Sequence, residues 1–384
     1  MTSFYSIWPS VVCVVGLLAF ASTPLFSVAD TAPTLEIKRV RTLDGLRGFL
    51  AFAVVFHHIA IYRNFLLDGN WQDSPSRYYT ELGPIGVSLF FMITGYLFWF
   101  KLCKEKGRPN WHSLYIGRIF RIGPLYIFAV LLAFALDQVH GAPLPIYTQL
   151  KPLVSLGAFQ YQDPHMFLAG VTWSIKYEWC FYFSLPILAL LARYPKVRTP
   201  LLTFAASAFA IAATLMPRGD GWKPTNVSIM LLFSLGMLAV PLKDQLTALP
   251  DRYASVMSIL LCAAAFLPRT TYAPITSILL GVVFLLVSSG ASIFGLLTMR
   301  AAIRLGDVSY GIYLLQGLAL LSLRFTPVRR FALSSSPHFW LIQFVEVTML
   351  AVTAMITHVL IERPGIKLGR KIAGNAPQET PRIG

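Results

Sequence analysis

The chain has 384 residues, of which 56% are hydrophobic and 13% are charged. Soluble globular domains carry about 25% charged residues, so this composition excludes a domain that exposes most of its surface to water. The formal net charge of +15 comes from Lys and Arg in short loops between apolar segments, which is the positive-inside pattern of membrane proteins, and we therefore expect a lipid bilayer and no nucleic acid as a partner.

The apolar segments are long enough to cross a membrane. A bilayer core of about 30 Å needs about 20 helical residues, and several segments approach this length with almost no charge. The sequence therefore predicts an all-α, polytopic transmembrane helix bundle with about ten core spans plus one extra N-terminal apolar helix, and segment 147–160 is predicted to be interfacial or re-entrant. The predicted spans are 7–28, 45–66, 83–100, 119–136, 169–192, 200–216, 226–242, 253–268, 273–297, 303–323 and 339–361.

Basic loops predict the orientation of the spans. Basic residues recur on one side of the predicted membrane, which places that side and the C-terminus in the cytoplasm of a bacterium, with the spans in its inner membrane. One loop breaks the rule, because Arg324, Arg329 and Arg330 fall outside. The cytoplasmic groups include Arg41, Lys101, Lys104, Arg193, Lys196, Arg198, Arg300, Arg304, Lys367, Arg370 and Lys371.

Three regions follow from this pattern: an extra apolar helix with a basic linker (1–40), a transmembrane domain (41–364) and a short cytoplasmic tail (365–384). Residues 1–30 contain no Lys or Arg, so the charged start of a signal peptide is missing. We expect a retained helix with its N-terminus outside. A mis-assigned start site and an atypical signal peptide are the alternatives.

Arg47 and His58 form the first candidate site. They lie eleven residues apart, which leaves about 20° of offset on a helix and a rise of about 16 Å. Arg47 is therefore expected at the cytoplasmic mouth, with Asp44 orienting it, and His58 about halfway through the bilayer. His57 points some 80° away from this stripe, by the same helical geometry. Ionisable side chains inside a membrane are costly and mostly functional, although an interfacial anchor and a packed histidine pair are the alternative.

Arg118 and Arg121 form the second candidate site. Their i, i+3 spacing puts both guanidinium groups on one face at a cytoplasmic helix start. Two such forks suit a phosphate or diphosphate. A topology signal is the alternative.

Glu178 is the third candidate, within the sequence TWSIKYEWCFYF. Ser174 lies one turn before it and Tyr182 one turn after it, on the same face. A buried acid needs partners, and His58 is expected at a similar depth. A structural, hydrogen-bonded glutamate is the alternative.

The four cysteines lie in or beside different apolar segments, without CxxC or Cys/His pairing. This spacing argues against a zinc site and a disulfide framework, and no metal is expected. The residues are Cys13, Cys103, Cys180 and Cys262.

Taken in order, these motifs resemble the integral-membrane acyltransferase family 3, whose members O-acylate surface polysaccharides, peptidoglycan, lipo-oligosaccharides and some antibiotics. The resemblance covers about residues 41–364, and span 7–28 is an addition to it. GVSLFFMITGY, LGDVSYGIYLLQ and the terminal ERP also look like family segments. The family's Arg-ten residues-His, RxxR and WSxxxE…FY elements correspond to Arg47 with His58, Arg118 with Arg121, and Trp173, Ser174, Glu178, Phe181 and Tyr182.

The resemblance implies an acyl-CoA co-substrate, acetyl-CoA by default, that enters from the cytoplasm. Arg118 and Arg121, with Arg47, would hold its phosphates. His58 would act as general base on a hydroxyl of a glycan, lipo-oligosaccharide or similar acceptor, either directly or through an acyl-enzyme step. Glu178 would fix the imidazole tautomer. No bound cofactor is implied, and the acceptor, the acyl chain, the face of product release and the oligomeric state stay open.

Two other function classes are alternatives at this point. A transporter or flippase of a lipid-linked sugar also needs many spans and charges at mid-membrane, but such proteins commonly show internal repeats and broken helices, and we find neither. A non-catalytic membrane subunit would not need the Arg47–His58 stripe. Acyl transfer by purified protein distinguishes the three classes.

Overall fold

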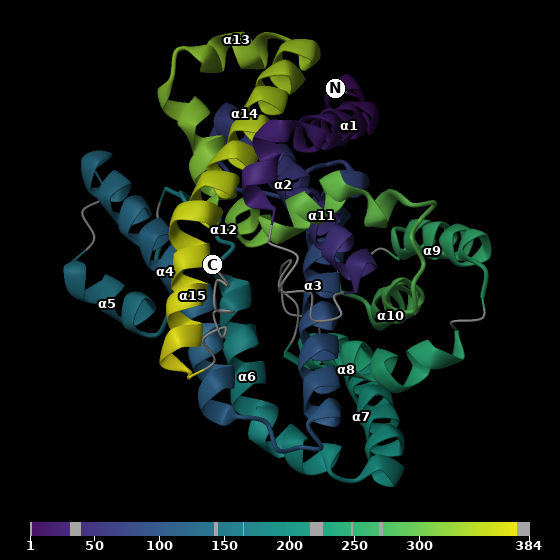
Figure 1. The fold of residues 1–384 in the computed structure, drawn as a ribbon. Coiled ribbons are helices and arrows are strands. Elements are labelled where there is room, and N and C mark those ends of the chain that lie inside the picture. Colours follow the sequence, from purple (N-terminus) through teal and green to yellow (C-terminus); the bar gives the residue numbers. More distant parts are fainter. Residues whose placement is uncertain are drawn as a thin grey trace, which may run out of the picture.

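The computed structural model describes residues 2–30, 40–141, 145–163, 165–215, 226–246, 249–268 and 272–374. Within these ranges every regular element is a helix, and the helices form a bundle (Figure 1). This confirms the predicted all-α fold. In a bilayer core no water is present to bind backbone N–H and C=O groups, so apolar segments adopt helices, which pair these groups internally.

Seven helices of the described chain are long and apolar enough to cross a membrane, judged by length and composition. They are α2 (Arg41–Asp68), α3 (Arg77–Lys104), α4 (Trp111–Val139), α6 (Trp173–Ala192), α7 (Pro195–Leu215), α8 (Asn226–Leu242) and α14 (Ser336–Thr357), which continues through a π-helical turn into α15 (Arg363–Ile372). The shorter helices are α1 (Trp8–Ser22), α5 (Ile146–Val154), α9 (Asp251–Ala265), α10 (Pro274–Ser288), α11 (Arg300–Asp307), α12 (Ser309–Ser322) and α13 (Val328–Ser334).

Each predicted span overlaps at least one of these helices, but several helices are shorter than the predicted span. Segments 7–28, 253–268 and 273–297 contain helices of 15 residues each, and segment 303–323 is divided between α11 and α12. Segment 147–160 forms the short helix α5 and a following turn. The apolar pattern therefore predicted where helices form better than how long they are.

The outward faces of the bundle are apolar. On α7, Phe204, Ile211 and Leu215 are exposed, whereas polar Gln316 on α12 and Gln343 on α14 are fully buried. A water-soluble protein seldom exposes so many large apolar side chains together, and lipid tails are as apolar as those side chains. The surface is therefore suited to a bilayer.

Close helix contacts explain the small residues of GVSLFFMITGY. A Cβ atom added to Gly95 on α3 would lie 2.5 Å from the carbonyl oxygen of Phe233, and one added to Gly236 on α8 would lie 2.1 Å from that of Met92. Both distances are far inside van der Waals contact. Small residues let the backbones of α3 and α8 meet, as they do in many membrane helix pairs.

Helices α2 and α3 run antiparallel, because Gly83 of α3 lies against His57 of α2 and Gly86 lies against Leu50. They define the two ends of the bundle. The basic end contains the start of α2, the end of α3 and the start of α4, with Arg41, Lys101 and Arg118. The loop end contains residues 69–76, which connect α2 to α3.

The N-terminal segment, residues 2–30, packs along the bundle, and hydrogen bonds hold both of its ends. At the loop end, the Tyr79 hydroxyl donates to the Ser6 carbonyl over 2.7 Å, and the Trp340 indole N–H donates to the Phe4 carbonyl over 3.0 Å. On α1 itself, Leu17 is buried. The predicted extra helix is therefore a packed element whose N-terminal side lies at the loop end.

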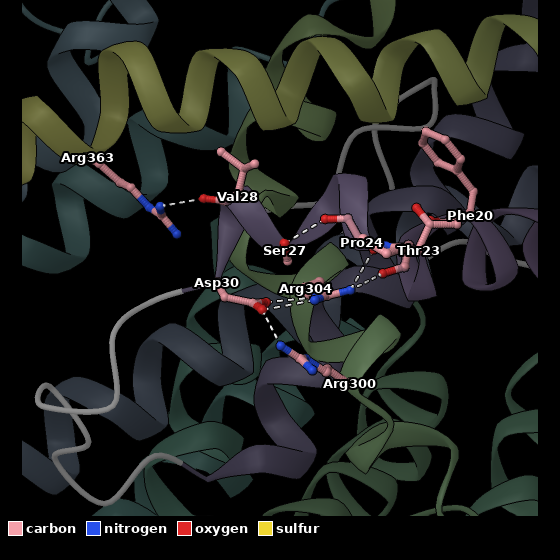
Figure 2. A network of polar contacts seen from close by, with 10 residues as sticks. Phe20, Thr23, Pro24, Ser27, Val28, Asp30, Arg300, Arg304 and Arg363 are labelled. Atoms are coloured by element: carbon pink, nitrogen blue, oxygen red, sulfur yellow. Dashed lines mark hydrogen bonds and ion pairs between the residues drawn. The ribbon is translucent and has the colours of Figure 1, made fainter.

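At the basic end, Asp30 anchors the same segment (Figure 2). The Arg304 guanidinium donates to both Asp30 carboxylate oxygens, over 2.7 and 2.9 Å, and also to the Ala21 carbonyl over 2.8 Å. Arg300 forms a second ion pair with Asp30. The hydrogen bond from Arg304 is the main reason why the pKa of Asp30 is lowered to about 2.

The structure describes only part of the predicted N-terminal linker region and of the predicted C-terminal tail. The predicted basic linker falls on residues 31–39, which lie outside the described residues. The predicted tail begins as part of α15, which packs on α4: a Cβ added to Gly369 would lie 2.6 Å from Cβ of Phe120. Residues 375–384 lie outside the described residues.

Candidate active site

A cavity of about 250 Å³ lies between α2 and α3 near the loop end. Its wall includes Gln72 and Asp73, which are exposed, so the cavity opens at that end. The wall combines apolar and aromatic side chains with a few polar groups, as is usual for ligand sites. The remaining lining residues are Val54, His57, His58, Ile61, Trp71, Thr80, Gly83, Pro84, Val87, Met166, Ala169, Gly170, Trp173, Tyr272 and Tyr313.

His58 lines this cavity with a defined tautomer. Its Nδ1 lies 3.0 Å from the Val54 carbonyl oxygen and 3.0 Å from Oε1 of Gln316. Both neighbours are acceptors, so Nδ1 carries the proton and Nε2 keeps its lone pair. His58 can therefore accept a proton at Nε2.

Gln316 is held in the orientation that His58 needs. Its side-chain Nε2 donates to the Tyr313 carbonyl over 2.7 Å, which leaves Oε1 to face the imidazole. The residue is fully buried on α12, 258 positions away from His58 in the chain. In the sequence, Gln316 ends the family-like segment LGDVSYGIYLLQ, and no local pattern there pairs it with His58.

Glu178 does not occupy the place that we predicted for it. Its Oε2 accepts a hydrogen bond from the Tyr182 hydroxyl over 2.6 Å, and Tyr182 also interacts with Arg118. The prediction that Glu178 orients His58 is therefore wrong, because Gln316 makes that contact. Similar depth along two helices did not fix the direction in which the side chains point. The prediction that Glu178 and Tyr182 share one helix face is confirmed.

Four helices bring charged side chains together toward the basic end. Arg47 on α2 is half-buried and lies within electrostatic range of Arg121 on α4, Glu178 on α6, Asp307 on α11 and its own neighbour Asp44. Arg47 therefore faces other protein groups rather than lipid. We call the group formed by Asp44, Arg47, Arg118, Arg121, Glu178 and Tyr182 the charged cluster.

The charged cluster and the cavity are separate along α2. The cavity wall contains His58 and not Arg47, and eleven helical residues span about 16 Å. On α6, Ser174 lies one turn before Glu178 of the charged cluster, and its hydroxyl lies 2.9 Å from that of Tyr313, which lines the cavity. The predicted stripe is thus divided into two sites with a polar contact between them.

His57 also lines the cavity, which the helical stripe did not predict. Its Nδ1 lies 3.0 Å from the Tyr79 carbonyl oxygen, and its ring centroid lies 5.0 Å from that of His58. The ring rests on Gly83 of α3, where an added Cβ would lie 2.6 Å from Cδ2 of His57. His57 and His58 are consecutive on α2 and point about 100° apart, yet the cavity is wide enough for both to line it.

The loop at residues 166–170 closes the cavity on the side of α12. Met166 and Ala169 have positive φ angles of 61° and 51°, a conformation that costs energy for residues other than glycine. The backbone of Ala169 lies against Gly317, where an added Cβ would lie 2.5 Å from its nitrogen. Burial raises the pKa of Asp163, at the base of this loop, to about 7. Its carboxylate accepts from the Leu168 N–H over 2.7 Å.

Comparisons with known proteins agree with the motifs. Acyltransferase MdmB of Streptomyces mycarofaciens is 28% identical over 322 residues, covering 74% of this chain and 80% of that protein. Nodulation protein 10 of Rhizobium leguminosarum bv. viciae is 24% identical over 363 residues, covering 85% and 93%. No solved structure matches the chain significantly.

The family of acyltransferase domains matches residues 40–361, which is most of the chain. This range contains the cavity, the charged cluster and all the helices from α2 to α14. The chain therefore belongs to the integral-membrane acyltransferase family 3, and it is a multi-pass membrane acyltransferase.

Proposed function

We propose that the protein transfers an acyl group, in the simplest case acetyl, from acyl-CoA to a hydroxyl group of a glycan or glycolipid. The observation that carries this proposal is His58: an imidazole oriented by Gln316, whose Nε2 has no hydrogen-bond partner in the described part of the chain, in a cavity that opens at the loop end. An acyltransferase needs a group that removes the proton of its acceptor hydroxyl, and an oriented histidine is the most common such group.

In this proposal His58 is the general base. Nε2 takes the hydroxyl proton as the acceptor oxygen attacks the acyl carbon, and the resulting imidazolium is stabilised at Nδ1–H by the Gln316 and Val54 oxygens. The imidazolium then returns the proton to the departing sulfur. General base catalysis of this kind accelerates a reaction by about 10²–10⁴-fold.

The charged cluster binds the phosphates of the donor. Guanidinium groups form paired, charge-assisted hydrogen bonds with phosphate oxygens, and Arg118 and Arg121 project from one turn of α4, with Arg47 nearby. Glu178 and Asp44 offset the repulsion between these cations. Tyr182 connects Glu178 to Arg118. Asp44 and Glu178 are thus assigned to the donor site in this proposal.

The orientation follows from the basic end. We assign this end, and with it the C-terminus, to the cytoplasm of a bacterium, because Lys and Arg collect on the cytoplasmic side of inner-membrane proteins. Cytoplasmic acyl-CoA then reaches the charged cluster directly. The acceptor reaches the cavity from the opposite face, where Trp71 and Trp173 present aromatic walls against which the apolar face of a sugar ring packs.

The test uses purified protein in lipid nanodiscs with radiolabelled acetyl-CoA and a cell-envelope glycan extract. Wild-type protein is expected to label the glycan fraction, and His58→Ala is expected to lose about 10²–10⁴-fold of this rate. His338→Ala is the matched control, because His338 stacks on Phe331 and does not line the cavity. An absence of label with wild-type protein, or full labelling by His58→Ala, would overturn the proposal.

A further inference from the structure

Tyr272 lines the cavity, and the proposed mechanism assigns no role to its hydroxyl group. The residue precedes α10, lines the same cavity as His58 and is only 7% exposed. Among the described residues, no hydrogen-bond partner of its hydroxyl is found. A nearly buried phenol normally has a partner, so a group that enters the cavity is the natural candidate for this one.

The other hydroxyl groups in the cavity wall are already engaged. The Thr80 hydroxyl donates to the Ser74 carbonyl over 2.9 Å, and the Tyr313 hydroxyl donates to the Val171 carbonyl over 3.1 Å. The Gln316 amide donates to the Tyr313 carbonyl. The wall contains three hydroxyl-bearing residues, Thr80, Tyr272 and Tyr313, and of these Tyr272 alone has a hydroxyl without a hydrogen-bond partner among the described residues.

The backbone at Tyr272 is held in an unfavourable conformation. Its φ angle is +58°, in the left-handed region, which side chains other than glycine, asparagine and aspartate seldom adopt. Such a conformation persists only where the surroundings impose it, and it is more frequent at functional sites. Helix α10 begins at Pro274, with Ala273 as its N-cap residue, so this conformation helps to set the position of a cavity-lining residue just before the helix starts.

We propose that the Tyr272 hydroxyl donates a hydrogen bond to the oxyanion of the tetrahedral intermediate. This inference rests on the proposed function. When the acceptor oxygen bonds to the acyl carbon, the carbonyl π electrons move to the carbonyl oxygen, and His58 holds the acceptor proton. When the carbonyl reforms, the carbon–sulfur bond breaks and the thiolate takes that proton. Tyr272 keeps its own proton throughout, and its hydrogen bond is strongest while the oxygen is negative.

The test compares Tyr272→Phe with Tyr177→Phe in the nanodisc assay. Tyr177 also carries a hydroxyl, which donates to Asn226 and not into the cavity. We expect Tyr272→Phe to lower kcat by about 10²-fold, the usual effect of removing one oxyanion donor, with KM for acetyl-CoA unchanged. Tyr177→Phe is expected to keep wild-type values. Equal kcat for Tyr272→Phe and wild type would overturn the proposal.

A second measurement separates catalysis from structure. Replacing Tyr272 by 3,5-difluorotyrosine retains the ring and makes the phenol a stronger hydrogen-bond donor, so kcat is expected to reach or exceed that of the unmodified protein. A fluorinated protein as slow as Tyr272→Phe would refute donation by this hydroxyl. If wild-type protein transfers no acyl group at all, the proposed function fails. If wild type is active and Tyr272→Phe is equally active, this inference alone fails.

Discussion

The cavity and the charged cluster are both polar sites inside an apolar bundle, but they are built from different groups. The cavity presents imidazole, phenol and amide groups, and its histidine is oriented by a neutral glutamine. The charged cluster joins three arginines with Glu178 and Asp44. Neutral, oriented groups are suited to moving a proton, whereas clustered guanidinium groups are suited to holding phosphate.

In the proposed mechanism, α2 contacts one substrate from each side of the membrane. Arg47 and His58 lie on the same face of this helix but differ in depth by about 16 Å. Changes in the cavity should therefore lower the rate of the chemical step, and changes in the charged cluster should weaken donor binding. The following variants test this division.

The largest effect after loss of His58 itself is expected for Gln316→Leu. This change removes the side-chain acceptor that faces Nδ1 of His58 and replaces it with an apolar side chain of similar volume. Loss of a group that orients a catalytic histidine is costly, and we expect kcat to fall by about 10²-fold. KM for acetyl-CoA should stay unchanged in a steady-state titration. Gln149→Leu on α5, outside both sites, is the control. A change in KM alone would break the comparison.

A smaller effect, in the other kinetic parameter, is expected for Arg121→Gln. One charge-assisted hydrogen bond contributes about 1.5–3 kcal/mol, so KM for acetyl-CoA should rise about tenfold or more, with kcat recovered at saturating donor. Arg198→Gln, on α7 at the basic end, is the matched control. The comparison fails if Arg121→Gln stays slow at every donor concentration.

Gly83→Ala tests whether the close packing of α3 supports the cavity. The added Cβ would lie 2.6 Å from the His57 ring, and overpacking of this kind costs about 1–3 kcal/mol. We expect a lower thermal unfolding midpoint and a several-fold lower kcat. Gly117→Ala on α4 is the control, since an added Cβ there meets nothing within 4 Å. Equal behaviour of the two variants would show that the His57 ring has room to move.

The smallest effect is expected far from both sites, at Asp30→Asn. Because the folded-state pKa of Asp30 is about 2, below its unfolded value of about 3.9, its ion pair with Arg304 stabilises the fold above pH 4 and is lost as the pH falls toward 2. At pH 7 we expect a loss of about 1 kcal/mol without a change in kcat.

The control for this variant is Glu105→Gln, whose exposed contact with Lys101 is 4.0 Å long and should contribute little. Thermal unfolding of both variants at pH 7 and at pH 3 gives the comparison. A difference between Asp30→Asn and wild type that grows as the pH falls would contradict the assigned pKa shift.

Local periodicity predicted those features that depend on one helix at a time. It selected His58 on the stripe of Arg47, paired Arg118 with Arg121, and placed Tyr182 beside Glu178. Each relation spans at most eleven residues, and helical geometry fixes it whatever the tertiary structure. The apolar segments likewise predicted the positions of helices, since each predicted span overlaps at least one.

Contacts between distant segments could not be predicted in this way. Gln316 meets His58 across 258 residues, and Tyr272 reaches the cavity from the residue before α10. Depth alone suggested Glu178 as the partner of His58, but that carboxylate accepts from Tyr182 on its own helix and lies near Arg47 rather than His58. Which faces of two helices meet depends on the packing of the whole bundle, as at the glycine contacts of α3 and α8.

The most direct test of the central claim, that His58 is the base of the cavity, is chemical rescue. The acetyl transfer rate of His58→Ala is measured at saturating acetyl-CoA with increasing free imidazole. We predict a rate about 10²–10⁴-fold below wild type that more donor does not restore and that imidazole partly restores, while Arg121→Gln responds to the donor and not to imidazole. A His58→Ala protein that transfers acetyl groups at the wild-type rate without imidazole would contradict the account.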